Sequence, residues 1–289
     1  MERDAFSRCH PAVCFSYFVA AIGCGMVFQH PAYILASVLC GTLYTCILFG
    51  RKGLLRVLSM LPLPVLTALL NPLLNHRGKH ILFLCMGKPY TLEALSYGLA
   101  LGGIFLVMLI WFGCYSEVLT SDKFTALFGS LLPSLSLLLV MILRLIPAFT
   151  RKTGQILDAR RAIGMGAEQS SSLKSKLQSG MTVLSALTSW ALEGSIITAD
   201  SMRARGYGAA KRTSFRLYRL TGQDVFLLVL TGALFGAVLL CGGTGASFTP
   251  VMKIPPLDWG FGAYCCLLLI PVILDWKEAL QWRISISKI

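Results

Sequence analysis

The sequence contains the nine-residue stretch DSMRARGYG at residues 200–208 and a related stretch, DARRAIGMG, at residues 158–166. Placed in register, the two copies share the pattern D-x-x-R-A-x-G-x-G. Glycine readily adopts the left-handed conformation that ends a helix, and the helix dipole favours basic side chains near the C-terminus. A single copy is typical of many basic helix ends, but two copies in register indicate a function. We therefore predict that each copy ends a helix, presents arginines to water and forms one of two docking points.

The overall composition is typical of a membrane protein. Of the 289 residues, 55% are hydrophobic and 13% are charged, and the mean hydropathy is +0.70. These values lie outside the range of soluble domains. The net charge of +13 does not indicate a nucleic-acid partner, because the basic residues flank apolar runs and no RNA-binding fingerprint or zinc spacing occurs. We therefore predict an all-α polytopic membrane protein that contacts the lipid bilayer and binds no nucleic acid.

Six stretches are long and apolar enough to cross a bilayer, which takes about 20 residues of helix. They are residues 11–29, 31–50, 56–75, 94–115, 223–242 and 259–275. If the loops 76–93 and 243–258 face outside, 22 of the 26 Lys and Arg residues lie inside. Because basic loops stay on the cytoplasmic side, this asymmetry predicts six spans with both termini in the cytoplasm.

The chain divides into three predicted segments. Residues 1–115 hold four spans, residues 116–222 form a cytoplasmic-side region of long amphipathic helices, and residues 223–289 hold two spans. Residues 131–149 resemble a seventh span, but a seventh span exports 13 basic residues. We therefore expect helices that lie along the inner membrane interface.

The first of these helices is expected to begin near Ser121 and to carry an apolar stripe. Pro133 and Pro147 are expected to bend or break it, because proline lacks a backbone N–H. Arg144 lies within the apolar stripe. Its side chain is expected to reach water or to pair with an acidic residue.

A second helix is predicted from about residue 173 to residue 205. Glu193 and Asp200 are seven residues apart and fall near one face of this helix. Arg205 is rotated by about 140° from Asp200, at about 100° per residue. One helix is therefore able to contact two partners through different faces.

Catalytic and metal-binding motifs are absent from the sequence. It contains no Walker A motif, no HExxH and no GxSxG. His76 and His80 are four residues apart in an outer loop, where a solvated role is favoured over metal binding. We expect no catalytic residue, metal or cofactor. The alternatives to a subunit driven by partners are a self-sufficient carrier and an intramembrane enzyme.

Five short motifs follow one another in an informative order. They are SRCHPAV at 7–13, TSDKF at 120–124, LRLIP at 143–147, AIG at 162–164 and ARG at 204–206. This order resembles that of the transmembrane T component of energy-coupling factor (ECF) importers of vitamins or metal ions. The resemblance covers nearly the whole chain and is most specific at the second Ala-Arg-Gly signature.

The resemblance implies a scaffold in a prokaryotic cell membrane, without ATPase activity of its own. Two ABC-type ATP-binding subunits dock on two coupling helices, and a membrane S component binds the substrate. The docking residues it implies are Arg160, Arg161, Ala162, Ile163, Gly164, Arg203, Ala204, Arg205 and Gly206. Residues assigned to coupling with the S component are Pro133, Arg144, Pro147, Glu193 and Asp200.

The first signature departs from the family pattern, because Ile163 replaces the arginine. Either Arg160 or Arg161 supplies the missing charge from the preceding turn, or the two ATPase sockets differ. The sequence leaves both interpretations open.

Overall fold

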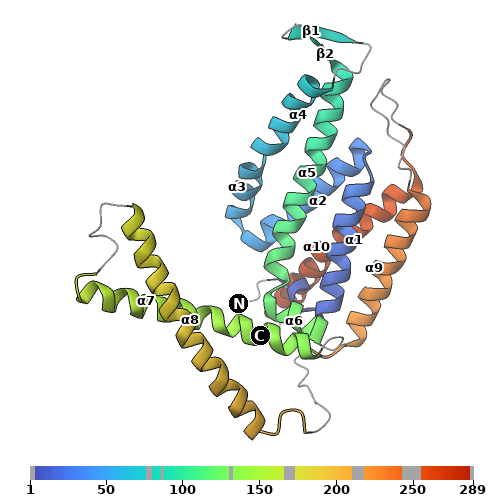
Figure 1. Ribbon diagram of the computed structural model, residues 1–289. Coiled ribbons are helices and arrows are strands. Elements are labelled where there is room, and N and C mark those ends of the chain that lie inside the picture. Colours follow the sequence, from blue (N-terminus) through green and yellow to red (C-terminus); the bar gives the residue numbers. More distant parts are fainter. Residues whose placement is uncertain are drawn as a thin grey trace. The chain divides into compact units, whose positions relative to one another are not determined.

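The computed structural model describes residues 4–75, 80–85, 88–129, 133–165, 173–209, 218–242 and 255–286 (Figure 1). It divides into two compact units, each of which is described by itself. One comprises Met1–Phe124 together with Tyr218–Ile289, and the other comprises Thr125–Leu217. The second unit lies within residues 116–222, where the sequence predicts long amphipathic helices.

The first unit is a helical bundle with one β-hairpin. Its helices are η1 (Phe6–Arg8), α1 (Pro11–Val27), α2 (Pro31–Phe49), α3 (Arg51–Met60), α4 (Pro62–Leu74), α5 (Leu92–Val118), α9 (Gly222–Cys241) and α10 (Trp259–Ile286). Strands β1 (Ile81–Cys85) and β2 (Lys88–Thr91) pair antiparallel between α4 and α5. The sequence predicts only a loop there, because two strands this short lack a clear alternation of apolar and polar residues. Helix α6 (Ser121–Gly129) begins at the residue predicted to start a helix.

Several helical segments are long and apolar enough to cross a membrane. They are Pro31–Phe49, Lys52–Leu74, Leu92–Val118, Gly222–Cys241 and Trp259–Trp282. The remaining predicted span is α1, whose 17 residues extend about 26 Å, at the lower limit for a spanning helix. The predicted class, an all-α polytopic membrane protein, is therefore confirmed. Helix α10 runs well beyond its predicted end at residue 275.

The predicted span 56–75 consists of α3 and α4, which meet at Leu61. Pro62 is the first residue of α4, a position where its missing N–H leaves no bond unmade. Helix α4 then packs closely on α5. A Cβ atom at Gly98 would lie 2.9 Å from the Ala68 carbonyl oxygen, and one at Gly102 would lie 2.6 Å from that of Pro64. Glycines four residues apart therefore let the two backbones approach, as expected of spanning helices.

The core of this unit is a cluster of aromatic side chains. The Trp111 ring is fully buried, and its centroid lies 5.9 Å from that of Tyr17 and 6.4 Å from those of Phe18 and Tyr44. Its indole Nε1–H donates a hydrogen bond of 2.8 Å to the Ser37 hydroxyl. Trp111 thus joins α1, α2 and α5 and leaves its own polar group satisfied.

Helices α1 and α2 begin in the same way, at the repeated tripeptide HPA (residues 10–12 and 30–32). In each copy the histidine Nδ1 accepts the backbone N–H of the alanine at 3.2 Å. The proline occupies the first helical position, where no N–H is needed. The backbone N–H of His10 donates to the Asp224 carboxylate at 3.0 Å, which ties α1 to α9.

Exposed tryptophans lie at both ends of the apolar segment Trp259–Trp282 of α10 and, within it, at Trp276. Trp259 begins the helix and Trp276 lies 17 positions later, about 26 Å along the axis. Tryptophan is enriched at the two membrane interfaces, and this spacing is close to the thickness of the hydrocarbon core. We infer that α10 leaves the hydrocarbon near Trp276 and that Asp275 lies at that boundary.

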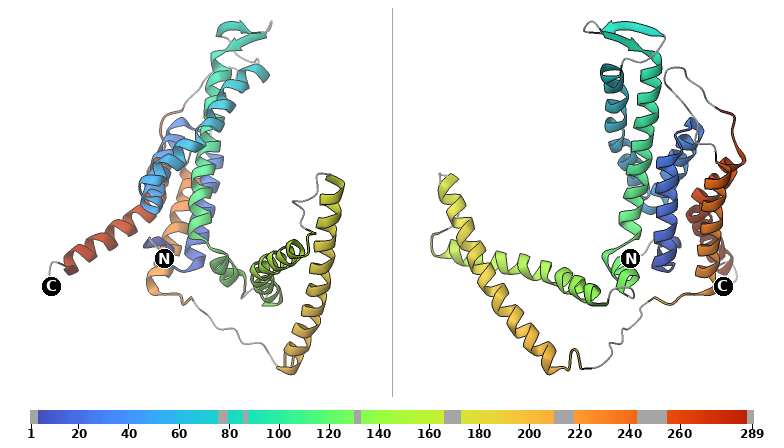
Figure 2. Two further views of the ribbon diagram at one scale, coloured as in Figure 1. Left: turned by 90° about the vertical axis from the view of Figure 1, so that its left-hand side faces the viewer. Right: turned by 45° about the vertical axis from the view of Figure 1, so that its right-hand side comes forward.

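The second unit is built on two long helices, α7 (Pro133–Ala162) and α8 (Leu173–Ala204), which cross as an antiparallel pair (Figures 1 and 2). At the crossing, the Phe149 ring packs edge-on against Trp190 with centroids 5.5 Å apart. Nearer the end of α7, Arg160 Nη2 donates a hydrogen bond of 3.0 Å to the Ser179 hydroxyl. The two contacts are eleven residues apart on both helices, from Phe149 to Arg160 on α7 and from Ser179 to Trp190 on α8. Together they hold the pair of helices.

Two prolines in this unit have different effects. Pro133 is the first residue of α7, so it starts the helix. Helix α7 continues through Pro147, so of the two predicted effects, a bend or a break, the break does not occur there. A proline removes one backbone hydrogen bond. Phe149 packs on Trp190 just beyond this point, so the helix has a tertiary contact close to the missing bond.

Candidate functional site

The first copy of the repeated motif closes α7 with a regular hydrogen-bond pattern. Gly164 has a φ of 74°. Its N–H donates to the Arg161 carbonyl at 3.0 Å, and the Met165 N–H donates to the Arg160 carbonyl at 2.9 Å. This pair of bonds defines a Schellman motif, which needs a residue in the left-handed conformation where glycine is favoured. The helix end predicted from the sequence is confirmed.

The second copy closes α8 with the same pattern. Gly206 has a φ of 80°. Its N–H donates to the Arg203 carbonyl at 2.9 Å, and the Tyr207 N–H donates to the Met202 carbonyl at 3.0 Å. Every bond of the first motif therefore has a counterpart 42 positions later. The two sequence copies are two copies of one backbone structure, and the last glycine of the first copy lies outside the described residues.

The two ends present different side chains to solvent. Arg203 and Arg205 are exposed at the end of α8, and so is Arg161 at the end of α7. Where the second copy has Arg205, the first has Ile163, which is 68% exposed. The prediction that arginines face water at both ends is confirmed. The end of α8 is strongly basic, whereas the end of α7 presents one exposed arginine beside the apolar side chain of Ile163.

The arginines of the first copy already have bonds within the unit. Arg160 is half-buried, and its Nη2 donates to the Ser179 hydroxyl at 3.0 Å and to the Met165 carbonyl at 3.5 Å. Arg161 forms an exposed ion pair with Asp158 at 3.6 Å. Arg160 thus links α7 to α8, a role that the sequence does not reveal because Ser179 belongs to another helix.

The last three turns of α8 project into solvent on all sides. Every residue from Leu192 to Ser201 is exposed, including Glu193 and Asp200, which the sequence places near one face. The N–H of Arg205 still donates to the Ser201 carbonyl at 3.2 Å, so helical geometry continues to this residue. The backbone of Arg205 therefore still follows the helix that the prediction of its direction assumed.

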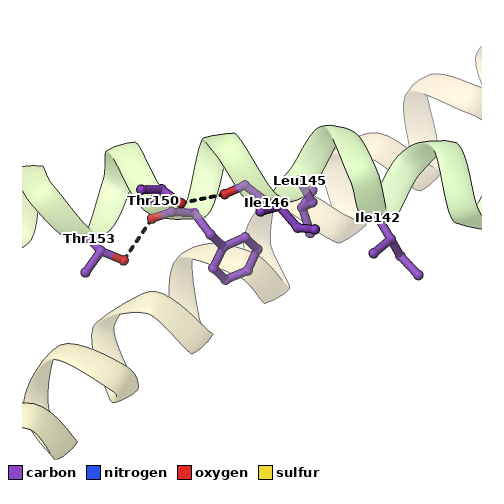
Figure 3. A pocket seen from close by; sticks show the side chains of 6 residues that line it. Ile142, Leu145, Ile146, Thr150 and Thr153 are labelled. Carbon is purple, nitrogen blue, oxygen red and sulfur yellow. Dashed lines mark hydrogen bonds between the residues drawn. The ribbon is translucent and has the colours of Figure 1, made fainter. Parts of the chain in front are cut away.

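An apolar groove follows α7 on the side next to the crossing with α8 (Figure 3). It has a volume of about 400 Å³ and is lined by Ile142, Leu145, Ile146, Phe149, Thr150 and Thr153. The Thr150 hydroxyl donates to the Ile146 carbonyl at 3.0 Å, and that of Thr153 donates to the Phe149 carbonyl at 2.8 Å. These bonds use the hydrogen of each hydroxyl within the helix, so the groove is mainly apolar. Arg144 lies in the same stretch of α7 and is exposed.

The predicted docking residues form two separate groups. Arg160 and its neighbours lie beside Ser179, near the start of α8, whereas Arg203 and Arg205 lie at its end. From Ser179 to Ala204 the helix axis extends about 37 Å, at 1.5 Å per residue. The structure therefore provides two surfaces, far enough apart for two different protein partners.

The comparisons with known proteins add no family assignment. Comparison of the chain with models of protein families finds no match, and comparison with curated proteins finds none either. Within the described part of the chain, no three His, Cys, Asp or Glu side chains are grouped to hold a metal ion. The candidate site is therefore defined by its geometry alone.

Proposed function

We propose that this chain is the transmembrane T component of an ATP-driven ECF importer of vitamins or metal ions. The observation that carries the proposal is the pair of matching Schellman motifs, which end two crossed helices. Arg160 of the first motif contacts Ser179, which lies about 37 Å along α8 from Ala204 in the second. A protein that couples two homologous ATPases to a membrane partner needs two similar docking points. Repetition of one backbone structure meets this need.

The chemistry of the two ends fits binding to acidic sockets on ATP-binding subunits. Arginine has a rigid fork of N–H donors that pairs with carboxylates, and the C-terminal end of a helix favours such cations. Gly206 lacks a side chain, so a partner backbone is able to approach the end of α8 closely. Arg203 and Arg205 bind one ATPase, whereas Ile163 and Arg161 bind the other through shape and a single charge.

Coupling to the membrane partner uses the rest of α7 and α8. The apolar groove of α7 offers Leu145, Ile146 and Phe149 to an apolar helix of an S component. Movement of the ATPases displaces the ends of α7 and α8, and the groove passes this displacement to the S component. The chain needs no catalytic residue or cofactor for this role.

Co-purification in mild detergent tests the proposed function. We expect two homologous ATP-binding subunits and a small membrane protein to accompany the chain, and we expect ATP hydrolysis only in the complex. Substrate transport by the purified chain alone, reconstituted in vesicles, would instead identify a self-sufficient carrier. Chemical turnover by the chain alone would identify an intramembrane enzyme.

The proposed orientation places both chain termini and both motifs in the cytoplasm of a prokaryotic cell. It rests on the asymmetry of basic residues between loops. In a variant without native cysteines, a membrane-impermeant maleimide applied to intact cells is expected to leave Ile163→Cys unlabelled and to label His80→Cys. Both positions are exposed, so access to the thiol is comparable. Labelling of position 163 from outside would contradict the orientation.

A further inference from the structure

We propose that Asp4 and Asp275 together form a proton-binding site, in which one shared proton holds the N-terminal segment Asp4–Cys9 against the helical bundle. The site joins the first described residue of the chain to α10, across 270 sequence positions between Ala5 and Asp275. It belongs to the first unit and is independent of the docking motifs on α7 and α8.

The N-terminal segment is bound to the bundle by directed contacts. The Ala5 N–H donates to Asp275 Oδ1 at 2.7 Å, and Arg8 forms an ion pair with Glu278 at 2.6 Å. The Phe6 ring is fully buried, and its centroid lies 5.0 Å from that of Tyr17. The segment therefore covers the end of the aromatic core, and its release would expose that core to water.

The two carboxyl groups need a proton to stay together. Asp4 is 1% exposed, and the bond from the next residue, Ala5, to Asp275 brings the two carboxyl groups within reach of a hydrogen bond. An ionised carboxylate is only an acceptor, so two ionised groups cannot form this bond. The Tyr44 hydroxyl donates to Asp4 Oδ2 at 2.6 Å, and the Ala5 N–H donates to Asp275. The Phe6 N–H also donates to Asp4 Oδ1, at 3.4 Å. None of these donors lies between the two carboxyl groups, so the bond between them depends on the shared proton.

The charged side chains near Asp4 have other bonding partners within the same cluster. Lys123 on α6 is buried, and its Nζ donates to the carbonyl oxygens of Ser7 and Val118, the latter at 3.1 Å. Arg8 is paired with Glu278 on α10. On α1 and in the turn before it, the titratable neighbours are Cys14, whose thiol donates to the Phe6 carbonyl, and Cys9. Lys123 thus holds the segment through the Ser7 carbonyl, Arg8 holds it through the Glu278 side chain, and the proton neutralises the carboxyl pair.

The direction of the pH effect follows from this arrangement. Burial, then the hydrogen bond to Asp275, raise the pKa of Asp4 from 3.8 to about 7, against the lowering effect of the Tyr44 hydrogen bond. A raised pKa means that the closed segment binds a proton that the released segment does not. The stabilisation is complete below about pH 4 and is lost as the pH rises through about 7. Asp275 is half-buried and is followed by the exposed Trp276, so the site is not sealed from the surface of the bundle.

Hydrogen exchange of the full chain in detergent tests the proposal. After correction for the intrinsic pH dependence of exchange, protection of the amides in Asp4–Cys9 is expected to fall about tenfold per pH unit between pH 5 and 6.5, since one proton is bound in the closed state only. In Asp4→Asn the amide oxygen still accepts from Tyr44 and the amide N–H donates to Asp275, while the long 3.4 Å bond from the Phe6 N–H is lost. This variant is expected to keep the segment closed and to abolish the pH dependence.

Two controls make the result specific. Glu278→Gln removes one carboxylate from the same surface but leaves the buried pair intact, so its pH profile is expected to match that of the wild type. Asp275→Asn is expected to flatten the profile as Asp4→Asn does. Protection in the wild-type chain that is independent of pH between 5 and 7.5 would overturn the proposal. An unchanged slope in a folded Asp4→Asn or Asp275→Asn variant would do so equally.

Discussion

Replacing Arg205 by alanine is expected to abolish most ATP-driven uptake while the chain still inserts and binds its membrane partner. Truncating one member of a charged pair at a partly buried interface costs about 2–5 kcal/mol, which corresponds to a loss of affinity from about 30-fold to several thousand-fold. If Arg205 only caps its helix, the change costs about 0.3–1 kcal/mol. Uptake in vesicles and the affinity for each ATP-binding subunit distinguish the two cases.

Matched substitutions show whether the effect belongs to this position. Arg205→Lys keeps the charge but loses the bidentate fork, so only partial recovery is expected. Arg151→Ala removes an exposed arginine from α7 outside both motifs and is expected to transport normally. Normal uptake by Arg205→Ala at normal expression would instead assign the docking role to Arg203.

Replacing Trp111 by alanine is expected to lower the free energy of unfolding by about 3–5 kcal/mol, as for other buried tryptophans. The ring is fully buried among Tyr17, Phe18 and Tyr44, and helices α1, α2 and α5 meet on it. Its removal leaves a cavity and also deprives the Ser37 hydroxyl of its donor. Circular dichroism during thermal unfolding in detergent measures the effect.

Two further variants separate packing from hydrogen bonding. Ser37→Ala leaves the buried indole N–H unsatisfied and is expected to cost about 1–3 kcal/mol. Phe112→Ala removes the neighbouring ring, which is 61% exposed, and is expected to change stability little. Equal melting temperatures for Trp111→Ala and Phe112→Ala would contradict the assignment of the core.

The sequence predicts those parts of the fold that depend on local patterns. Apolar length locates the spans, and Gly164 and Gly206 locate two helix ends, because these signals act within a few turns of helix. Helix α7 runs through Pro147, close to the contact of Phe149 with Trp190 on another helix, and a local pattern does not reveal such a contact. The hairpin Ile81–Thr91 is missed because its short strands carry no alternating pattern.

The contacts that organise the candidate sites join residues far apart in the chain. Arg160 meets Ser179 only after α7 and α8 fold back on one another. Asp4 and Asp275 meet only when the last helix closes the bundle. Neither pair has a signature in spacing or composition, so the internal role of Arg160 and the buried carboxyl pair emerge only from the structure.

The projecting end of α8 has a mechanical consequence. Beyond the Phe149–Trp190 contact, α8 continues for 14 residues to Ala204, about 21 Å, without packing along Leu192–Ser201. This segment is able to rotate as a rigid helix about the Trp190 contact, and Arg205 lies at its far end. A rotation of about 10° about this contact moves the far end about 4 Å, given the rise of the helix. A small change in the crossing angle of α7 and α8 therefore displaces Arg205 by a distance comparable to that between two side chains in contact.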